Sequence, residues 1–429
     1  MRFVHVVGCE GYARTLIDEA RRYAGMGECR LGAVVVDPVV NGADRATERT
    51  RELTAQGWQV YPTLPALVAD HWPQSRQSGG PRDLLCLPLP INLHLPFVRS
   101  GLEAGFDVLC EKPAAGTVAE IREMQAIEAR SEGSLFFGFQ HVLTDALQNV
   151  SELLARGAAD GTGPGRLLAA RGLVLWPRRD SYYRRNSWAG RLEVAGPDGR
   201  QQRILDSPLQ NATAHFLHAL LETSAAAGWR PAAVHAEHLR ARAEIDSADL
   251  QALQVELKPL RPGAAQPGPS PVITCIAAHC IDEQQDPLLQ WDCQGGRITW
   301  SFPDTLTVEL AGAPPQVVEG GLSGPELNAV ALRRALRTDL PPGARRGVTA
   351  ESALLHTAVL EAAFTGVTPV NPVPLAPGVT TAGGGREDDR QLVIPGVAEA
   401  ARQGFDQGRL LAAKLPGLPF RCVEAPVLP

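Results

Sequence analysis

The chain has 429 residues, of which 44% are hydrophobic and 21% charged, and its formal net charge is −6 at pH 7. This length predicts two domains, and the composition is typical of a soluble globular protein. The mixed, slightly acidic charge argues against a nucleic-acid partner. The sequence contains no apolar run of about 18 residues, so we expect no membrane span. The N-terminus lacks the features of a signal peptide, so we expect a cytoplasmic protein. The eight cysteines include no C-x-x-C pair, which indicates reduced core thiols rather than disulfides or a metal site.

The first predicted domain begins with a strand at residues 2–7, followed by a turn and an amphipathic helix. The turn has the position of the dinucleotide-binding fingerprint G-x-G-x-x-G/A. Gly8 suits the tight turn, Gly11 supplies backbone freedom, and Ala13 suits the packing of the helix on the sheet. Glu10 replaces the middle glycine and brings a negative charge near the expected pyrophosphate. Its carboxylate must therefore point away, or the loop must lie further out.

An acidic residue ends the next predicted strand, at residues 30–37. Asp37 can accept hydrogen bonds from the adenosine ribose hydroxyls and would repel a 2′-phosphate, and residues 38–40 offer no arginine to bind one. The pattern therefore favours NAD over NADP as the cofactor. The alternative is that Asp37 only caps a turn before Pro38.

A strand, loop, helix and second strand are predicted over residues 83–113. The second strand runs straight into Glu111, Lys112 and Pro113. In an open parallel sheet the carboxyl ends of the strands face the ligand crevice, and Pro113 favours an extended conformation for the residue before it. Lys112 is therefore either a ligand-binding lysine or an ordinary surface lysine at a strand end.

Three motifs in this stretch resemble those of the Gfo/Idh/MocA family of oxidoreductases: a P-x-x-x-H turn from Pro90 to His94, an E-A-G that begins at Glu103, and E-K-P from Glu111 to Pro113. By order and spacing the resemblance covers roughly residues 3–365. It implies an α/β chain with an N-terminal Rossmann domain, built on a doubly wound parallel sheet. A C-terminal α+β domain with a large, mostly antiparallel sheet would follow.

The resemblance also implies a domain plan and a cofactor site. The NAD-binding domain would cover residues 1–145, the substrate and oligomerisation domain 146–368, and a linker with a helical tail 369–429. The family's catalytic lysine corresponds to Lys112, and the cofactor site would include Pro90, His94, Glu111 and Gln140. For Gln140 a solvated loop is an equally good interpretation. Homodimers or homotetramers are expected, formed through the exposed face of the second sheet.

Residues 176–190, WPRRDSYYRRNSWAG, contain two tryptophans, two tyrosines and four arginines, and we call them the aromatic–arginine segment. Aromatic faces beside cationic groups suit a sugar or a sugar acid, although a stacked surface loop is the alternative. Family members often have a similar segment in the substrate cleft. The resemblance therefore predicts that several side chains of the segment contact the substrate: Tyr183, Arg184, Arg185, Asn186 and Trp188.

A helix is predicted to begin near Pro208, with Asn211, His215 and His218 on one face. The resemblance implies that His215 is catalytic. Asn211 replaces an aspartate of the family pattern and can position a hydroxyl but cannot take a proton. Asp206, one turn earlier, is a candidate to supply the carboxylate. We interpret His218 as a core histidine, and we predict no metal site.

The rest of the chain predicts the second sheet. A hairpin is expected around Pro197 and Asp198, and antiparallel strands at 234–243, 248–257, 272–280, 296–302 and 305–310. Helices at 327–337 and 350–363 are expected to pack on this sheet.

Together these features predict an NAD-dependent oxidoreductase acting on a secondary alcohol of a sugar, polyol or sugar derivative. Hydride would pass to the nicotinamide, and either Lys112 or His215 would take the hydroxyl proton. One alternative is a redox-neutral, NAD-retaining glycosidase of the same fold. The other is a non-catalytic relative that binds a sugar or a partner protein and has lost the cofactor, which Glu10 and Asn211 favour.

Overall fold

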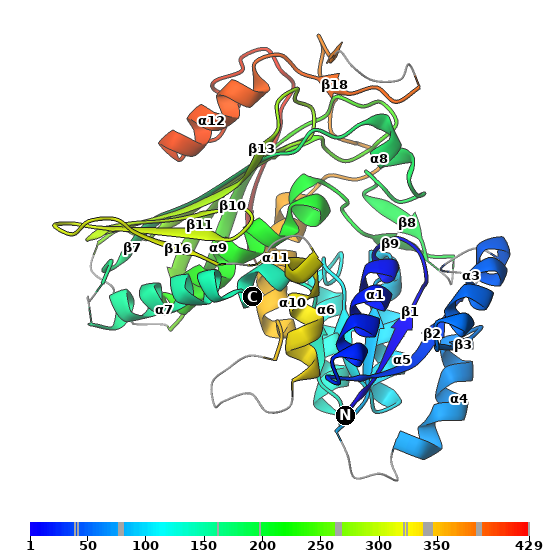
Figure 1. Ribbon diagram of the computed structural model, residues 1–429. Helices are drawn as coiled ribbons and strands as arrows, with labels where there is room; N and C mark the ends of the chain where they lie inside the picture. Colours follow the sequence, from blue (N-terminus) through cyan, green and yellow to red (C-terminus); the bar gives the residue numbers. More distant parts are fainter. Residues whose placement is uncertain are drawn as a thin grey trace. The chain divides into compact units, whose positions relative to one another are not determined.

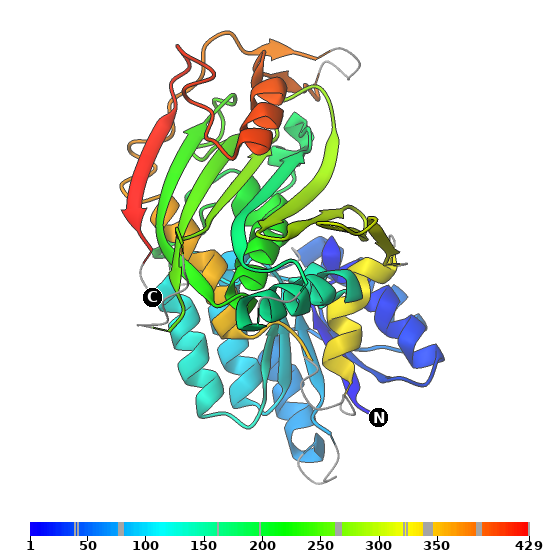
Figure 2. The ribbon, with the colours of Figure 1, turned by 90° about the vertical axis from the view of Figure 1, so that its left-hand side faces the viewer.

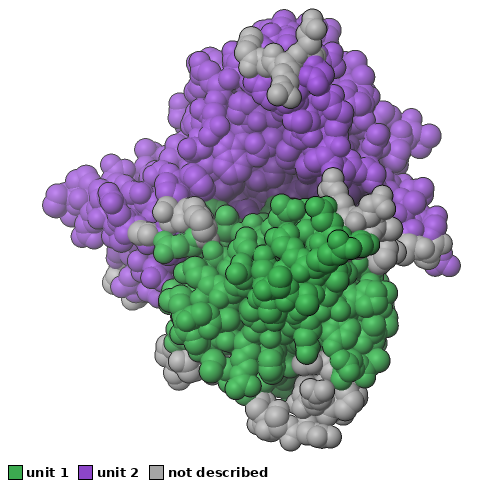
Figure 3. Space-filling model, turned by 45° about the vertical axis from the view of Figure 1, so that its right-hand side comes forward, with its two compact units in different colours: residues 1–143, 323–354 green, residues 144–322, 355–429 purple. Residues whose placement is uncertain are grey.

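The computed structural model describes these residues: 1–37, 40, 43–75, 81–160, 163–196, 199–261, 268–320, 322, 325–337, 346–382 and 388–427. The chain divides into two compact units (Figure 3). Unit 1 consists of residues 1–143 and 323–354, and unit 2 of residues 144–322 and 355–429. No helix among the described residues is long and apolar enough to cross a membrane. That residues 1–145, 146–368 and 369–429 act as separate domains stays a prediction.

Unit 1 contains a six-stranded parallel sheet in the order β3-β2-β1-β4-β5-β6 (Figure 1). Its strands are β1 Phe3–Val7, β2 Arg30–Val35, β3 Gln59–Tyr61, β4 Leu84–Leu87, β5 Asp107–Cys110 and β6 Leu135–Phe137. Strands such as β4 and β5 are short, continuous and buried at every position, as expected where helices cover both faces. The strand order reverses between β1 and β4, which creates the switch point where such sheets bind ligands.

The helices of unit 1 connect these parallel strands: α1 Tyr12–Gly25, α3 Ala43–Ala55, α4 Leu64–Ser75, α5 His94–Glu103 and α6 Val118–Ala129. Short turns η1 Ile91–Leu93 and η2 Gln140–Leu143 follow β4 and β6. Thr117 caps α6, because its hydroxyl accepts the Glu120 N–H while the Glu120 carboxylate accepts the Thr117 N–H.

The helix expected at 327–337 does not pack on the second sheet, so that prediction is wrong. It forms α10, Pro325–Leu336, and contacts α1, η2 and β5 of unit 1. Buried polar groups hold it there: Arg2 donates to the Ala335 carbonyl at 2.7 Å and pairs with Asp107 at 2.6 Å. Arg346 pairs with the same Asp107 at 2.8 Å. These partners are far apart in sequence, so helical periodicity alone cannot locate the helix.

Unit 2 is built on a nine-stranded sheet in the order β16-β15-β14-β13-β7-β12-β11-β10-β19. All neighbours are antiparallel except β7 and β12. The strands are β7 Leu167–Leu175, β10 Trp229–Leu239, β11 Leu250–Pro259, β12 Val272–Ala278, β13 Gln285–Cys293, β14 Gly296–Ser301, β15 Thr305–Leu310, β16 Gln316–Glu319 and β19 Arg421–Pro426. Together with the parallel sheet of unit 1, this confirms the predicted fold class.

Two layers cover opposite faces of this sheet (Figure 2). Gly172 of β7 faces Leu220 of α9, Ala214–Ala226, and a longer side chain there would crowd it. The neighbouring Leu173 and Leu175 point the other way, because side chains alternate along a strand, and pack against α12, Val397–Gln407. The helix α7, Asp145–Asp160, also contacts α9. The helix α11, Ala350–Ala363, has residues in both units.

The C-terminal segment is an integral part of unit 2. The last strand, β19, pairs antiparallel with β10 and forms one edge of the sheet. Apolar residues of the segment join the core on that face: Ile394, Val397, Ala401, Phe405 and Leu411. Two small strand pairs complete the unit, β17 Thr380–Thr381 with β18 Leu392–Val393, and β8 Glu193–Ala195 with β9 Gln201–Arg203. The latter is the predicted hairpin, whose turn residues Pro197 and Asp198 lie outside the described residues.

Candidate functional site

The turn after β1 has an open backbone at the positive end of α1. Gly8 has φ 102°, and its N–H donates to the Val35 carbonyl at 2.8 Å, which fixes the tight turn. Gly11 has φ 59° and is exposed, and a Cβ there would meet no atom within 4 Å. The helix α1 begins at Tyr12 without a side-chain cap, and Ala13 is buried against the sheet. An unfilled helix N-terminus with an accessible backbone fits a pyrophosphate.

Glu10, which breaks the fingerprint, is held by two arginines. Its carboxylate accepts a hydrogen bond from Arg14 at 2.9 Å, and Oε1 lies 3.5 Å from Nε of Arg49 in α3. Arg14 is one helical turn along α1, whereas Arg49 comes from a different helix and was not identified from the sequence. The negative charge is therefore balanced inside unit 1, and the turn remains compatible with a dinucleotide.

Asp37 follows β2 at the same carboxyl edge of the sheet and is only 8% exposed. Its carbonyl accepts the Val40 N–H at 3.0 Å, so the backbone does turn here. Pro38, which the turn-cap alternative invokes, lies outside the described residues. The ribose-binding role of Asp37 therefore stays a prediction.

Lys112 is the second residue after the end of β5 and is half-buried. Its backbone N–H donates to Oε2 of Glu111 at 3.1 Å. Burial raises the pKa of Glu111 to about 7, although the charge of Lys112 opposes this rise. Gly138 leaves room for the Glu111 carboxylate, which a side chain at 138 would strike. Burial, aided by the positive charge of Lys112, lowers the pKa of His141 to about 3, so this imidazole is neutral at physiological pH.

His94 is buried within unit 1, and its ring contacts backbone carbonyls. The side chain is fully buried, with Nδ1 3.1 Å from the Ala114 carbonyl and Nε2 2.9 Å from the Leu89 carbonyl. It thereby links the turn after β4 to the segment after Lys112. Pro90 begins that turn and its carbonyl accepts the Leu93 N–H at 2.9 Å. We therefore infer that His94 acts on a cofactor only through the backbone that it holds.

Gln140 begins η2 directly after β6 and is 5% exposed. The solvated loop considered for it is wrong, because both Gln140 and His141 are buried in unit 1. His141 directly follows Gln140 but is not among the residues predicted for the cofactor site. Its histidine side chain next to Gln140 was the available signal.

In unit 2 the aromatic–arginine segment forms the short helix α8, Asp180–Arg184, and the turn after it. Tyr183 is buried and donates its hydroxyl to Asp249 Oδ1 at 3.0 Å. Asn186 Oδ1 accepts the backbone N–H groups of Trp188 and Ala189 at 3.2 and 2.8 Å. Tyr183 and Asn186, both predicted to contact the substrate, thus make hydrogen bonds that stabilise unit 2 itself.

Arg184 also has protein partners. It donates to the Asp388 carbonyl and lies 3.8 Å from the Asp180 carboxylate and 3.9 Å from that of Asp389. The segment 388–391 therefore runs alongside α8. Asp389 accepts both the N–H and the hydroxyl of Ser181, at 2.7 and 3.1 Å.

Tyr182, which was not among the predicted site residues, has two arginines over its ring. The guanidinium carbon of Arg185 lies 3.6 Å from the ring centroid and that of Arg178 lies 5.0 Å from it. Arg185 is also 5.2 Å from the ring of Trp188. The two consecutive tyrosines, Tyr182 and Tyr183, were the sequence feature that could have identified Tyr182. Consecutive residues of a helix face different directions, so the pair alone does not show which of the two rings is buried.

Asp206 and Asn211 are brought together as one hydrogen-bonded unit. Asp206 Oδ1 accepts from Asn211 Nδ2 at 2.8 Å, and Oδ2 accepts the Gly190 N–H at 2.6 Å. The expectation that Asn211 and His215 share one regular helix is wrong. Asn211 lies in a π-helical turn, η3 Pro208–Ala212, and α9 begins only at Ala214. The cause is Thr213, whose N–H and hydroxyl both donate to the Pro208 carbonyl, at 2.9 and 2.8 Å.

His215 occupies the first turn of α9 and is 8% exposed, whereas His218 is completely buried. That burial is what the core interpretation of His218 expects. Among the described residues no group of three His, Cys, Asp or Glu side chains could hold a metal ion.

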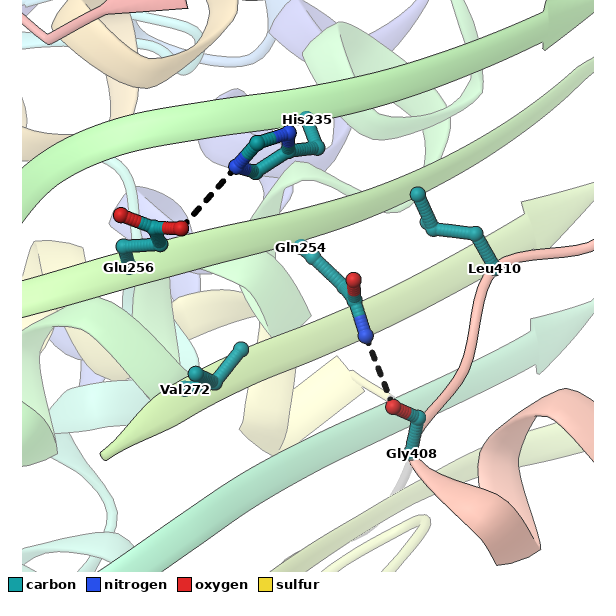
Figure 4. Close-up of a pocket in the computed structure, with 6 residues that line it drawn as sticks. All are labelled: His235, Gln254, Glu256, Val272, Gly408 and Leu410. Atoms are coloured by element: carbon teal, nitrogen blue, oxygen red, sulfur yellow. Dashed lines mark hydrogen bonds and ion pairs between the residues drawn. The ribbon is translucent and has the colours of Figure 1, made fainter. Parts of the chain in front are cut away.

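A separate hollow of about 310 Å³ lies on the α12 side of the nine-stranded sheet (Figure 4). Its lining residues are His235, Gln254, Glu256, Val272, Gly408 and Leu410. Gln254 donates to the Gly408 carbonyl at 2.8 Å, and His235 Nε2 lies 3.0 Å from Glu256 Oε1. None of the predicted site residues lines this hollow.

Comparison with protein families gives a match over residues 4–139 to the Gfo/Idh/MocA model, described as an oxidoreductase family with an NAD-binding Rossmann fold. Comparison with curated protein sequences finds no significant match. The description of the matched family confirms NAD as the predicted cofactor.

Several solved structures are similar over most of the chain. An oxidoreductase from Sinorhizobium meliloti has a TM-score of 0.65 at 12% identity, covering 85% of this chain and 96% of that one. The WlbA dehydrogenase from Bordetella pertussis, in complex with NADH and UDP-GlcNAcA, has a TM-score of 0.60 at 18% identity, covering 87% and 99%. The aldose-aldose oxidoreductase from Caulobacter crescentus, complexed with glycerol, has a TM-score of 0.58 at 18% identity, covering 86% and 98%.

At these identities the similarity shows a common fold. The family match, in contrast, covers the strands and turns that contain the fingerprint, the P-x-x-x-H turn and the E-K-P motif. The resemblance predicted from the sequence is thus confirmed over residues 4–139, which match the model of the Gfo/Idh/MocA oxidoreductases.

Proposed function

We propose that the protein is an NAD-dependent oxidoreductase that acts on a secondary alcohol of a sugar, a polyol or a sugar derivative. The observation that supports this most strongly is Lys112, presented at the carboxyl end of β5 in the same unit as the open turn at Gly8 and Gly11. The aromatic–arginine segment of unit 2 supports a carbohydrate-like substrate. Similar structures were determined with UDP-GlcNAcA and with glycerol.

The reaction divides an alcohol's two hydrogens between two acceptors. NAD, when bound, would supply the acceptor for the carbon-bound hydrogen as hydride, and the products would be a ketone and NADH. The amine of Lys112 takes the hydroxyl proton, and the positive charge of an oxidised nicotinamide would favour its neutral form beforehand. His141 remains uncharged beside it and can only exchange hydrogen bonds. His215 of unit 2 is the second candidate base.

Two observations support catalysis over the non-catalytic alternative. Glu10 is balanced by Arg14 and Arg49, so its charge does not argue against a bound dinucleotide. Asn211 has a hydrogen-bonded carboxylate partner, Asp206, which supplies an acidic group beside the position where the family pattern has an aspartate. The predicted homodimer or homotetramer and the cytoplasmic location stay predictions.

The first test is a titration of the purified protein with NAD(H) and NADP(H), after any co-purifying nucleotide has been identified. We expect tight NAD binding and weak NADP binding, because Asp37 would repel a 2′-phosphate. Turnover is then followed as NADH formation with sugars and polyols. Binding of neither nucleotide would overturn the proposal, and release of a free sugar without net NADH would favour the redox-neutral glycosidase.

Replacement of Lys112 by alanine tests the proposed base. We expect kcat to fall by roughly 10²- to 10⁴-fold, the range that general acid–base groups contribute, while NAD binding changes little. Lys414→Ala, in the turns that follow α12 in unit 2, is the matched control and should retain full turnover. Retained turnover in Lys112→Ala would refute the assignment and direct attention to His215.

A further inference from the structure

The arginines around α8 fall into two groups according to their partners. Arg242 is almost fully buried and contacts Asp180, with Nε 3.4 Å from Asp249. Arg390 pairs with Asp180 at 3.0 Å. Arg184 also lies between acidic residues, as described above. The carboxylates next to α8 are therefore engaged by this first group.

Arg178 and Arg185 form the second group. Within the described parts of the chain, no carboxylate lies within 4.0 Å of either guanidinium group. Aromatic rings hold them instead: both lie over Tyr182, Arg178 is 5.5 Å from the ring of Trp176, and Arg185 is 5.2 Å from that of Trp188. Arg185 also donates one hydrogen bond to the Tyr182 carbonyl. Stacking on rings orients a guanidinium group while leaving most of its N–H donors for another acceptor.

The buried edge of Arg178 also lacks an acceptor. Its Nε is inaccessible to solvent and has no hydrogen-bond partner in the described residues. An unsatisfied buried donor costs free energy, and a charged one costs more.

The surroundings are electropositive. His279, whose ring lies 5.8 Å from that of Tyr182, has its pKa lowered to about 3 by burial, with further lowering by Arg178, Arg185 and Arg242. The acid that faces Tyr182 from η3's side is Asp206, and its two oxygens are already bound to Asn211 and to the Gly190 N–H. These two donors are neutral and do not cancel the charge of the Asp206 carboxylate, but the two guanidinium groups of Arg178 and Arg185 still outnumber it.

We propose that Arg178 and Arg185 form a receptor for the anionic group of the substrate, and that the enzyme therefore acts on an acidic sugar derivative. A planar guanidinium group matches the oxygens of a carboxylate or a phosphate, so either oxyanion satisfies this chemistry. Tyr182, Trp176 and Trp188 supply apolar faces for the sugar ring. This inference rests on the proposed function and specifies its substrate class.

The test uses matched probes on the NAD-bound enzyme. D-Glucose is compared with D-glucuronate, and UDP-N-acetylglucosamine with its uronate, and each probe's binding is followed by tryptophan fluorescence alongside NADH formation. We expect the carboxylate member of at least one pair to bind at least ten-fold more tightly. If both UDP-sugars bind equally and neither simple sugar binds, the recognised anion is the diphosphate.

The variants Arg178→Gln and Arg185→Gln assign the effect to these side chains. Each should weaken binding of the anionic probe by roughly 10- to 100-fold, the value of a hydrogen bond to a charged group, while NAD binding is unchanged. Arg402→Gln, a half-buried residue of α12 that pairs with Glu283, is the matched control. Circular dichroism of all three variants establishes that the fold is intact.

Two outcomes would overturn the receptor. One is tighter binding of the neutral member of each pair, and the other is an equal loss of neutral and anionic binding in Arg178→Gln and Arg185→Gln. Absence of binding by every anionic probe would also count against it. The proposed function fails separately: NAD does not bind, or anionic probes bind but none is oxidised.

Discussion

The turn after β1 and the aromatic–arginine segment differ in whether their charged side chains have oppositely charged partners. In the turn, a single carboxylate, Glu10, is matched by Arg14 and Arg49. In the segment, Arg178 and Arg185 rest on aromatic rings, while neighbouring arginines take the nearby acids. The first arrangement removes a charge that would repel a phosphate, and the second retains charge that would attract one. The charge of a motif therefore has meaning only together with the partners that folding gives it.

Removing a paired arginine should have the largest effect. Arg242→Met would leave the carboxylates of Asp180 and Asp249 buried without their shared cation, and loss of one partner of a buried pair costs about 3–5 kcal/mol. Urea unfolding followed by tryptophan fluorescence measures the change in the free energy of unfolding. Arg178→Met, which breaks no ion pair, should cost about 1 kcal/mol or less. Equal losses in the two variants would show that the two groups of arginines do not differ as described.

Glu111 tests, within unit 1, the contrast between charged groups that have an oppositely charged partner and those that do not. This buried carboxylate has no arginine at ion-pair distance in the described residues. Its pKa of about 7 in the folded protein exceeds the ordinary value of 4.5. Between these values the folded state holds a proton that the unfolded state has lost. The associated stability is therefore fully present below pH 4.5 and is lost as the pH rises through about 7.

The two pKa values correspond to at most about 3 kcal/mol. Urea unfolding of the wild type at pH 5, 6, 7 and 8 should show the free energy of unfolding decreasing with pH. In Glu111→Gln the part of this decrease that is due to Glu111 should be absent. An identical pH dependence in the variant would contradict the assignment to Glu111.

The fold was largely predictable, because its signals are local. Continuous apolar strands followed by turns and amphipathic helices indicated the parallel sheet of unit 1, and alternating patterns indicated most strands of unit 2. The strand β13 was missed because Pro287 interrupts its pattern, and β19 because its pairing with β10 joins residues far apart in sequence. The position of α10 was missed for a similar reason, since Arg2, Asp107 and Arg346 are distant along the chain.

The site was predictable by segment but less well by residue. Residues 176–190 were identified as unusual, yet the choice between Tyr182 and Tyr183 depends on Asp249, which lies 66 residues further along. The same holds for Arg184, whose partners are Asp388 and Asp389. Composition therefore located the segment, and only the tertiary partners distinguish its structural residues from those left for a ligand.

The smallest expected effect concerns Glu10 itself. Glu10→Gln would leave Arg14 and Arg49 without their shared carboxylate beside the N-terminus of α1, and the added positive charge should favour an anionic ligand. We expect NADH to bind roughly 2- to 5-fold more tightly, a gain typical of a single charge near a helix end, and the gain should shrink at high salt because screening weakens exposed charges. Arg49→Gln should act in the opposite direction, because Glu10 would then be less well balanced. Fluorescence titrations with NADH at low and high salt measure both effects.

Weaker binding by Glu10→Gln at either salt concentration would mean that the carboxylate itself holds the nucleotide, and the contrast between the two regions would then fail at the turn.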